Sequence, residues 1–170
     1  MSKWWPFKKE PPVDEDALFR VAAAELQNFY DTQRSDGMSR QAILKYIEMQ
    51  SLMLENLPQT AETKATLRAN DAFHEQLQQS IQFNLTAGRQ HEMAGQLEQA
   101  VSHYEMALED QISTRFPYEH LRIIYRRNSY FEDALRVCAA AVQNPFLNEK
   151  DRKHFQTWAE RFAHQLEEEE

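Results

Sequence analysis

Residues 87–108 read AGRQHEMAGQLEQAVSHYEMAL, and residues 121–142, which begin 34 positions later, read LRIIYRRNSYFEDALRVCAAAV. Alanines occupy equivalent places in the two stretches, at Ala100 and Ala134 and again seven residues further on. Self-similarity at a repeat period of about 34 residues is typical of stacked helical hairpins. The two stretches therefore predict an all-α fold that is built from antiparallel helix pairs.

The recurrence of small residues has a physical reason. Residues seven apart lie two turns apart on one face of a helix, so Ala100 and Ala107 face the same neighbour, as do Ala134 and Ala141. Small side chains at these places allow the second helix of a hairpin to lie close to the first. A larger group between them, such as Tyr104, is expected to fill the centre of the hairpin.

This pattern resembles the tetratricopeptide repeat family, with matching residues from 84 to 146. Three positions depart from the family: its tryptophan is Asn84 or Tyr118, its glycine is Gly88 in the first copy but Arg122 in the second, and its closing proline is absent from the first copy and displaced to Pro145 in the second. The resemblance implies a TPR-like α–α superhelix. N-terminal helices and a C-terminal capping helix are expected to complete it, because two repeats are fewer than a solenoid usually needs.

The sequence divides into four expected regions. They are a flexible basic and aromatic arm (1–13), an N-terminal helical region (14–80), two TPR-like repeats (81–147), and a capping helix with an acidic tail (148–170). Turns within the repeats are expected at Gly95 and at Asn128-Ser129. The segment from Thr60 to Gly88 lacks Gly and Pro in between, which favours one long helix that runs into the first hairpin, although two helices that meet near Asn84 are the alternative.

Composition excludes several classes of function. The chain has 170 residues and a net charge of −8, which argues against general binding to nucleic acid, since phosphate neutralisation needs a basic surface. Its one cysteine, Cys138, falls on an expected core face and indicates a buried thiol in a reducing compartment. Because no apolar run is long enough to span a bilayer, a cytoplasmic location is expected.

The residues that usually carry chemistry are not arranged for it. Two His-Glu pairs occur, His74-Glu75 and His91-Glu92, but Gln78 and Gly95 stand where a zinc protease helix would place its second histidine. There is no phosphate-binding glycine loop and no paired cysteines for zinc. We therefore expect a protein that is not an enzyme and that has no metal or cofactor.

Two segments outside the repeats suggest contacts with other molecules. Trp4 and Trp5 lie among lysines, which suits docking onto a protein, contact with a membrane surface, or packing onto the first helices of the chain itself. Met49, Leu52 and Met53 widen the apolar face of the helix after Ser39, so that helix is expected to be central or part of an interface, and a homodimer is an open alternative.

The resemblance also implies a binding surface, because the first helix of each hairpin lines the concave face in this family. The corresponding residues are Leu85, Arg89 and Glu92 in the first copy and Glu119, Ile123, Arg126 and Arg127 in the second. The cationic and amide residues with which chaperone-tail binders of the family clamp a carboxylate are missing at Leu85, Glu119 and Ile123. A mixed apolar and basic strip remains, suited to an amphipathic segment with some acidic residues, unless the arginines only offset nearby glutamates.

The expected function is therefore a non-enzymatic protein-protein interaction module, an adaptor or scaffold that holds a peptide or helix against its repeats. The alternatives are a structural subunit of a homo-oligomer or larger assembly, and a peripheral membrane adaptor that is tethered by the arm. The sequence does not identify the partner.

Overall fold

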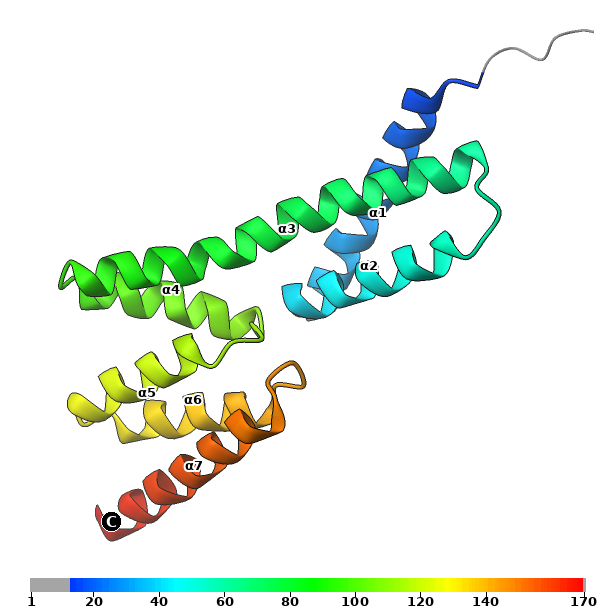
Figure 1. The fold of residues 1–170 in the computed structure, drawn as a ribbon. Coiled ribbons are helices and arrows are strands. Elements are labelled where there is room, and N and C mark those ends of the chain that lie inside the picture. The colour runs from blue at the N-terminus through cyan, green and yellow to red at the C-terminus, as the bar shows by residue number, and fades with distance from the viewer. Residues whose placement is uncertain (1–12, 170) are drawn as a thin grey trace, which may run out of the picture.

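The computed structural model describes residues 13–169, which form seven helices and no strand. In chain order, the helices are α1 (Glu15–Ser35), α2 (Arg40–Glu55), α3 (Ala61–Met93), α4 (Leu97–Glu109), α5 (Phe116–Arg127), α6 (Phe131–Gln143) and α7 (Glu149–Glu169) (Figure 1). The expected all-α class is confirmed for this part of the chain.

Short polar side chains begin four of the helices. Asp14, Ser39, Thr60 and Asn148 each accept a hydrogen bond from the backbone N–H three residues ahead, at 2.9 to 3.2 Å. These bonds satisfy amide groups that have no partner within the helix. The starts of α1, α2, α3 and α7 are thus encoded locally in the sequence.

The turns inside the two hairpins occupy equivalent positions. Gly95 joins α3 to α4 with a φ of 75°, and Ser129, one repeat period later, joins α5 to α6 with a φ of 60°. Glycine adopts this left-handed conformation freely, whereas serine does so at a cost of about 1 kcal/mol or more. The backbone of the second turn therefore repeats that of the first without its glycine.

The longest helix, α3, links two parts of the molecule (Figure 1). Its N-terminal half packs with α1 and α2, and its C-terminal half forms the first hairpin with α4. The segment without Gly or Pro thus continues as one helix to Met93. The boundary expected between regions 14–80 and 81–147 falls inside this helix, so the two regions share a rigid element and no linker separates them.

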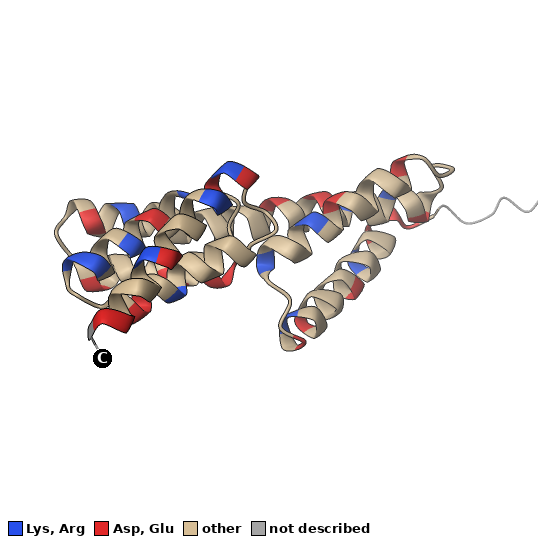
Figure 2. Ribbon diagram, turned by 90° about the horizontal axis from the view of Figure 1, so that it is seen from below, with Lys and Arg blue, Asp and Glu red and all other residues tan. Residues whose placement is uncertain are grey.

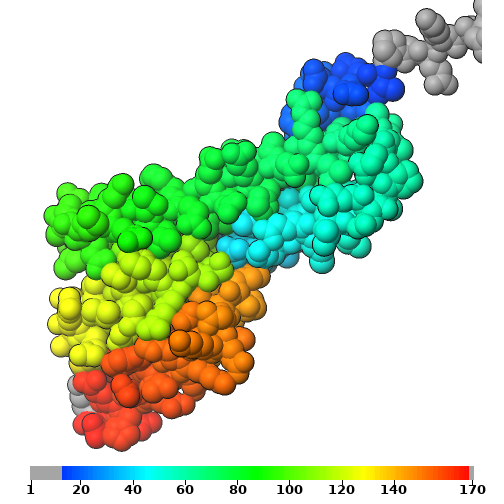
Figure 3. All heavy atoms as spheres, viewed as in Figure 1, coloured from blue at the N-terminus to red at the C-terminus, as the bar shows by residue number. Residues whose placement is uncertain are grey.

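From α3 onward, each helix packs against the next one in the chain. Figure 3 shows the helices from α3 to α7 layered one below another, with α1 and α2 to one side. Four alanines have no exposed surface where these helices meet: Ala100, Ala107, Ala134 and Ala141. The small residues of the repeated pattern therefore lie in the core, where they allow close helix packing.

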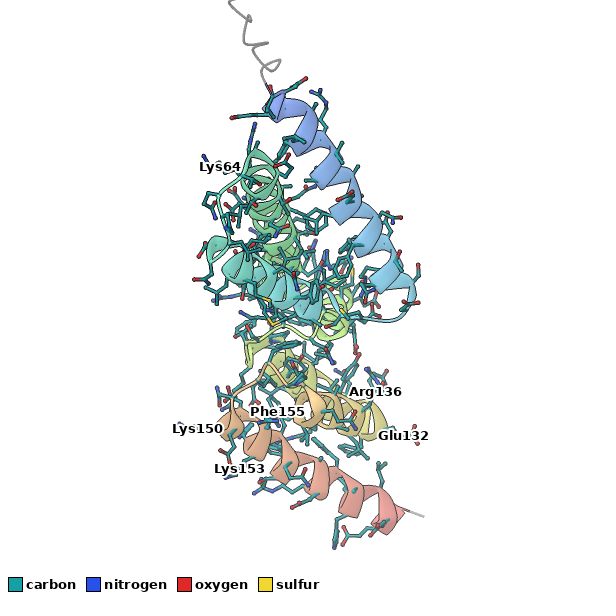
Figure 4. All side chains as sticks on the ribbon, turned by 90° about the vertical axis from the view of Figure 1, so that its right-hand side faces the viewer. Lys64, Glu132, Arg136, Lys150, Lys153 and Phe155 are labelled. Atoms are coloured by element: carbon teal, nitrogen blue, oxygen red, sulfur yellow. The ribbon has the colours of Figure 1, made fainter. Side chains whose placement is uncertain are left out.

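The last helix covers the second hairpin. Phe155 and Phe162 of α7 are buried, with 0% and 2% of their surface exposed. Figure 4 shows Phe155 among the side chains between α7 and the preceding helices, whereas Lys150 and Lys153 lie on the outer side. Covering the terminal hairpin removes its apolar face from water, as a helical stack requires.

A buried amide fixes the connection between α6 and α7 to the rest of the stack. Asn144 is fully buried, and its Nδ2 donates to the carbonyl oxygens of Gln111 and Ile112 and to the hydroxyl of Tyr118, at 2.7 to 3.1 Å. Its Oδ1 accepts a hydrogen bond from the backbone of Phe146 at 2.9 Å. This bonding ties the loop before α5 to the loop before α7.

Candidate protein-binding surface

Side-chain contacts join α3, α5 and α7 into one surface. His120 of α5 contacts Glu92 of α3, with 2.7 Å between Nδ1 and Oε2. His154 of α7 contacts Glu119 of α5, with 3.0 Å between Nε2 and Oε2. The two histidines are one repeat period apart in the sequence, so equivalent positions of α5 and α7 each contact a carboxylate on the helix two places earlier in the chain.

The part of this surface on α3 consists of apolar and basic groups. Leu85 is half-buried and packs on the core, while Arg89 is exposed. The guanidinium carbon of Arg89 lies 4.7 Å from the centre of the Phe116 ring, and Phe116 in turn stacks on His120 at 3.9 Å. Arg89 therefore lies on an aromatic face of α5, where cation–π attraction orients it.

Glu92 holds hydrogen bonds within the protein. Its Oε2 accepts from the hydroxyl of Tyr104 at 2.7 Å, and the same carboxylate accepts from His120. Burial alone would raise the pKa of Glu92, but the hydrogen bonds from Tyr104 and His120 outweigh burial and leave the pKa below its usual value. Glu92 is therefore ionised at neutral pH and connects α3, α4 and α5.

Glu119 likewise has its partners inside the molecule. It pairs with Arg122, with His154 and, at 3.6 Å, with Arg115. Burial opposes its ionisation, yet the hydrogen bonds from Arg122 and His154 prevail and lower its pKa. The sequence suggests that Glu119 contacts a partner, whereas this arrangement accounts for its charge without one.

The remaining three predicted residues lie together on α5. Ile123, Arg126 and Arg127 line a depression of about 250 Å³ with Arg122. Ile123 is half-buried, and both following arginines are exposed. The lining of this depression combines an apolar side chain with guanidinium donors, which suits a peptide side chain that carries an acidic group.

Trp158 on α7 extends the surface beyond the repeats. Three guanidinium carbons surround its ring, those of Arg122, Arg161 and Arg126, at 3.9, 4.8 and 5.4 Å from the ring centre. Sequence reasoning missed this cluster because it assigned Trp158 only to the covering helix. One signal could have indicated the cluster: Arg122 stands where the first copy has Gly88, and so large a cation at a core position needs a neighbour such as an aromatic ring.

A second exposed face lies on α2. Met49, Leu52, Met53 and Leu57 expose between 51% and 62% of their surface. The spacing of Met49, Leu52 and Met53 places them along one side of the helix, and Leu57 follows its end. The opposite side of α2 is in the core, where Ile43, Leu44 and Ile47 are buried, so the exposed side is the part that could form an interface, and that stays a prediction.

Two observations concern the residue types that usually carry chemistry. Burial raises the pKa of the Cys138 thiol to about 12, so the reactive thiolate is disfavoured. In the described part of the chain, no three His, Cys, Asp or Glu side chains are placed to hold a metal ion. Trp4 and Trp5 lie outside the described residues, so their contact with a protein or a membrane stays a prediction.

Among the helices between residues 15 and 169, none combines the length and the apolar character that crossing a membrane requires. Comparison with protein-family models, with curated proteins and with solved structures finds no match to this chain.

Proposed function

We propose that this chain is a non-enzymatic, TPR-like interaction module that binds a peptide or helix on the surface formed by α3, α5 and α7. Repeat-equivalent residues support a common arrangement of the three helices: Ala87, Leu121 and Phe155 follow one another at intervals of one repeat period, and all three are buried. In this arrangement α3, α5 and α7 are successive first helices, and their outward sides form one continuous face.

The observation that carries the proposal is the set of exposed side chains on this face. Arg126 and Arg127 are exposed beside the half-buried Ile123, with which they line a depression, and Arg89 is exposed on α3. Protein-binding surfaces commonly combine arginine with partly buried apolar groups, because such residues gain energy when a partner removes them from water. A peptide could therefore bury Ile123 while its acidic groups meet the arginines.

A capture experiment tests this proposal. The full chain is immobilised and used to retrieve proteins from a native lysate, and the double variant Ile123→Asp/Arg126→Glu is compared with wild type by mass spectrometry. We expect the variant to lose the partners that wild type retrieves, since it places negative charge where a partner would bind. Circular dichroism establishes that the variant is folded.

The matched control is Arg20→Glu/Val21→Asp, which makes the same kinds of change on α1. Both residues are exposed there, and Val21 has 56% of its surface in solvent. The control should retrieve the wild-type partners. If the Ile123→Asp/Arg126→Glu variant retrieves the same proteins as wild type, this surface is not the binding site.

The exposed face of α2 favours a second candidate function, that of a structural subunit in a homo-oligomer. Met49, Leu52 and Met53 would be covered by a second copy, and apolar surface of this kind is often an interface. Light scattering during gel filtration tests this candidate. If the wild-type chain is a dimer and Leu52→Glu/Met53→Glu is a monomer, α2 is the interface; a monomeric wild-type chain excludes it.

A further inference from the structure

The cluster around Trp158 holds more positive charge than its surroundings neutralise. Arg122 is paired with Glu119, but that carboxylate also contacts Arg115 and His154. The Nη1 atom of Arg122 is buried with no acceptor in the described part of the chain. The carboxylate of Glu119 is therefore shared between Arg122 and Arg115, and the charge of Arg122 is only partly compensated.

The neighbouring arginines form no ion pair with the side chains that the structure describes. Among the carboxylates of residues 13–168, none lies within 4.0 Å of the guanidinium nitrogens of Arg126, Arg127 or Arg161. Two carboxylates lie in their wider surroundings. The charge of Arg127 lowers the pKa of Glu92, and Glu160 lines a surface depression with Arg161. These side chains keep donors that are free to bind an anion.

This local excess contrasts with the acidic character of the whole protein. The chain has 27 acidic and 19 basic residues, and Figure 2 shows the two signs interspersed along the helices. Three guanidinium groups nevertheless surround a single ring, so they lie within about one Debye length of each other, roughly 10 Å at 0.1 M salt. Their mutual repulsion would be relieved by a bound anion.

We propose that Arg126 and Arg161, whose guanidinium groups lie beside the Trp158 ring, form with the exposed Arg127 of α5 a binding site for the carboxylates of an acidic peptide segment. The proposal rests on the proposed function for the idea that a partner docks on this face, and it names the chemistry of that partner. It also extends the surface to α7, since Trp158 and Arg161 belong to that helix.

The geometry favours side-chain carboxylates of aspartate and glutamate. Planar guanidinium groups bind carboxylates through two parallel hydrogen bonds, and stacking on an aromatic ring restricts their motion beforehand. The half-buried Ile123 beside Arg126 and Arg127 adds an apolar contact for the stem of a glutamate side chain. A segment with two or more acidic residues could engage Arg126 and Arg127 together.

Binding of a fluorescein-labelled oligoglutamate peptide to the full chain, followed by fluorescence anisotropy, tests the proposal. We expect saturable binding to wild type that weakens as ionic strength rises. Arg126→Gln/Arg127→Gln should weaken binding by about tenfold or more, since it removes two charged donors.

The matched control is Arg20→Gln/Lys64→Gln, which removes two exposed positive charges from α1 and the N-terminal end of α3. Figure 4 shows Lys64 at the opposite end of the molecule from α7. The control should bind oligoglutamate within about twofold of wild type, because distant charges are screened. Equal weakening of both double variants would mean general attraction and would overturn the proposal.

A second measurement locates the peptide. The indole N–H resonance of Trp158, assigned with Trp158→Phe, should shift when oligoglutamate saturates the protein. An unmoved resonance would place the peptide elsewhere and overturn the proposal, as would tighter binding of oligothymidylate, which would assign the cluster to nucleic acid.

The two proposals can fail separately. If captured partners depend on Ile123 and Arg126 but oligoglutamate does not bind, the docking surface stands and its acidic specificity is wrong. If oligoglutamate binds at Trp158 but no captured protein depends on Ile123 and Arg126, the anion site stands and the interaction module is wrong.

Discussion

Gly88 of α3 lies directly against the ring of Tyr104 on α4. A Cβ atom added to Gly88 would lie 2.5 Å from Cε1 and 2.6 Å from Cδ1 of that ring. The equivalent pair in the second hairpin, one repeat period later, is Arg122 and Cys138, and both are buried. In the first hairpin the first helix carries the small residue and the second helix the large one. In the second hairpin this order is reversed, with Arg122 on α5 and Cys138 on α6.

This contact predicts that Gly88→Ala destabilises the protein, although alanine favours a helix over glycine by about 1 kcal/mol. The Tyr104 ring has little room to move, because its hydroxyl bonds to Glu92 at 2.7 Å and its ring packs on Phe116. Overpacking of a buried site costs about 1–3 kcal/mol, so we expect a net loss of about 1 kcal/mol in the free energy of unfolding, measured by urea denaturation.

The second hairpin supplies the control. In a Tyr104→Cys background, which reproduces Cys138, the added methyl group of Gly88→Ala has space and should stabilise the protein. The two changes should therefore be strongly non-additive. A gain in stability from Gly88→Ala alone would mean that the two helices are further apart than described.

Ala134 makes the corresponding prediction for the second hairpin. It has no exposed surface, so Ala134→Leu should reduce the free energy of unfolding by about 1–3 kcal/mol through overpacking. Glu132→Leu is the matched control, because Glu132 is two residues away on the exposed side (Figure 4). Thermal melting measures both variants, and an unchanged melting temperature for Ala134→Leu would show that the repeat register is wrong.

Much of the fold could be predicted from the sequence because the signals are local. A side chain such as Ser39 or Asn148 caps a helix through its own neighbours, and Gly95 marks a turn through its own backbone. The small residues at Ala100 and Ala134 reveal the helix pairing through their spacing. The expected turn at Gly95 also agrees with the end of α3 at Met93, whereas Gly88 lies inside the helix and does not end it.

The binding surface was less predictable because it depends on how α7 packs. Spacing alone placed Glu119 on the outward side of α5, but α7 brings His154 to it and converts it to an internal partner. The same packing places Trp158 over Arg122. The pattern was read only from residues 87–108 and 121–142, so it did not reveal that His154 and Phe155 of α7 stand one repeat period after His120 and Leu121.

Buried tyrosines predict a loss of stability at alkaline pH. Burial raises the pKa of Tyr118 to about 12, and burial with a neighbouring carboxylate raises the pKa values of Tyr104 and Tyr125 further. The unfolded chain ionises its tyrosines near pH 10 while the folded chain holds their protons. These groups therefore stabilise the fold fully below pH 10 and lose that effect as pH rises toward about 12.

Urea midpoints measured across this range test the expectation, with phenolate absorbance reporting ionisation. The midpoint should fall from about pH 10 upward, and Tyr118→Phe should make the fall shallower. Tyr130→Phe, a change at an exposed ring, should leave the profile as in wild type. A midpoint that is constant between about pH 10 and 12 would contradict the burial of these hydroxyl groups.

The contact between Glu119 and Arg122 decides whether Glu119 serves the fold or a partner. Only 5% of the Arg122 side chain is exposed, so Glu119→Gln leaves a buried guanidinium without its carboxylate. We expect a loss of about 3 kcal/mol in the free energy of unfolding. In an Arg122→Met background the same change should cost less than about 1 kcal/mol, because no buried charge is then left unpaired.

The exposed pair of Asp133 and Arg136 is the matched control, since its residues have the same spacing on α6 and about half of each side chain is in solvent. Asp133→Asn should change stability by no more than about 1 kcal/mol. Urea denaturation measures every variant, and the capture experiment is repeated with Glu119→Gln. If that variant is as stable as wild type but loses its partners, Glu119 contacts the partner directly, and the internal role argued from its ion pairs is wrong.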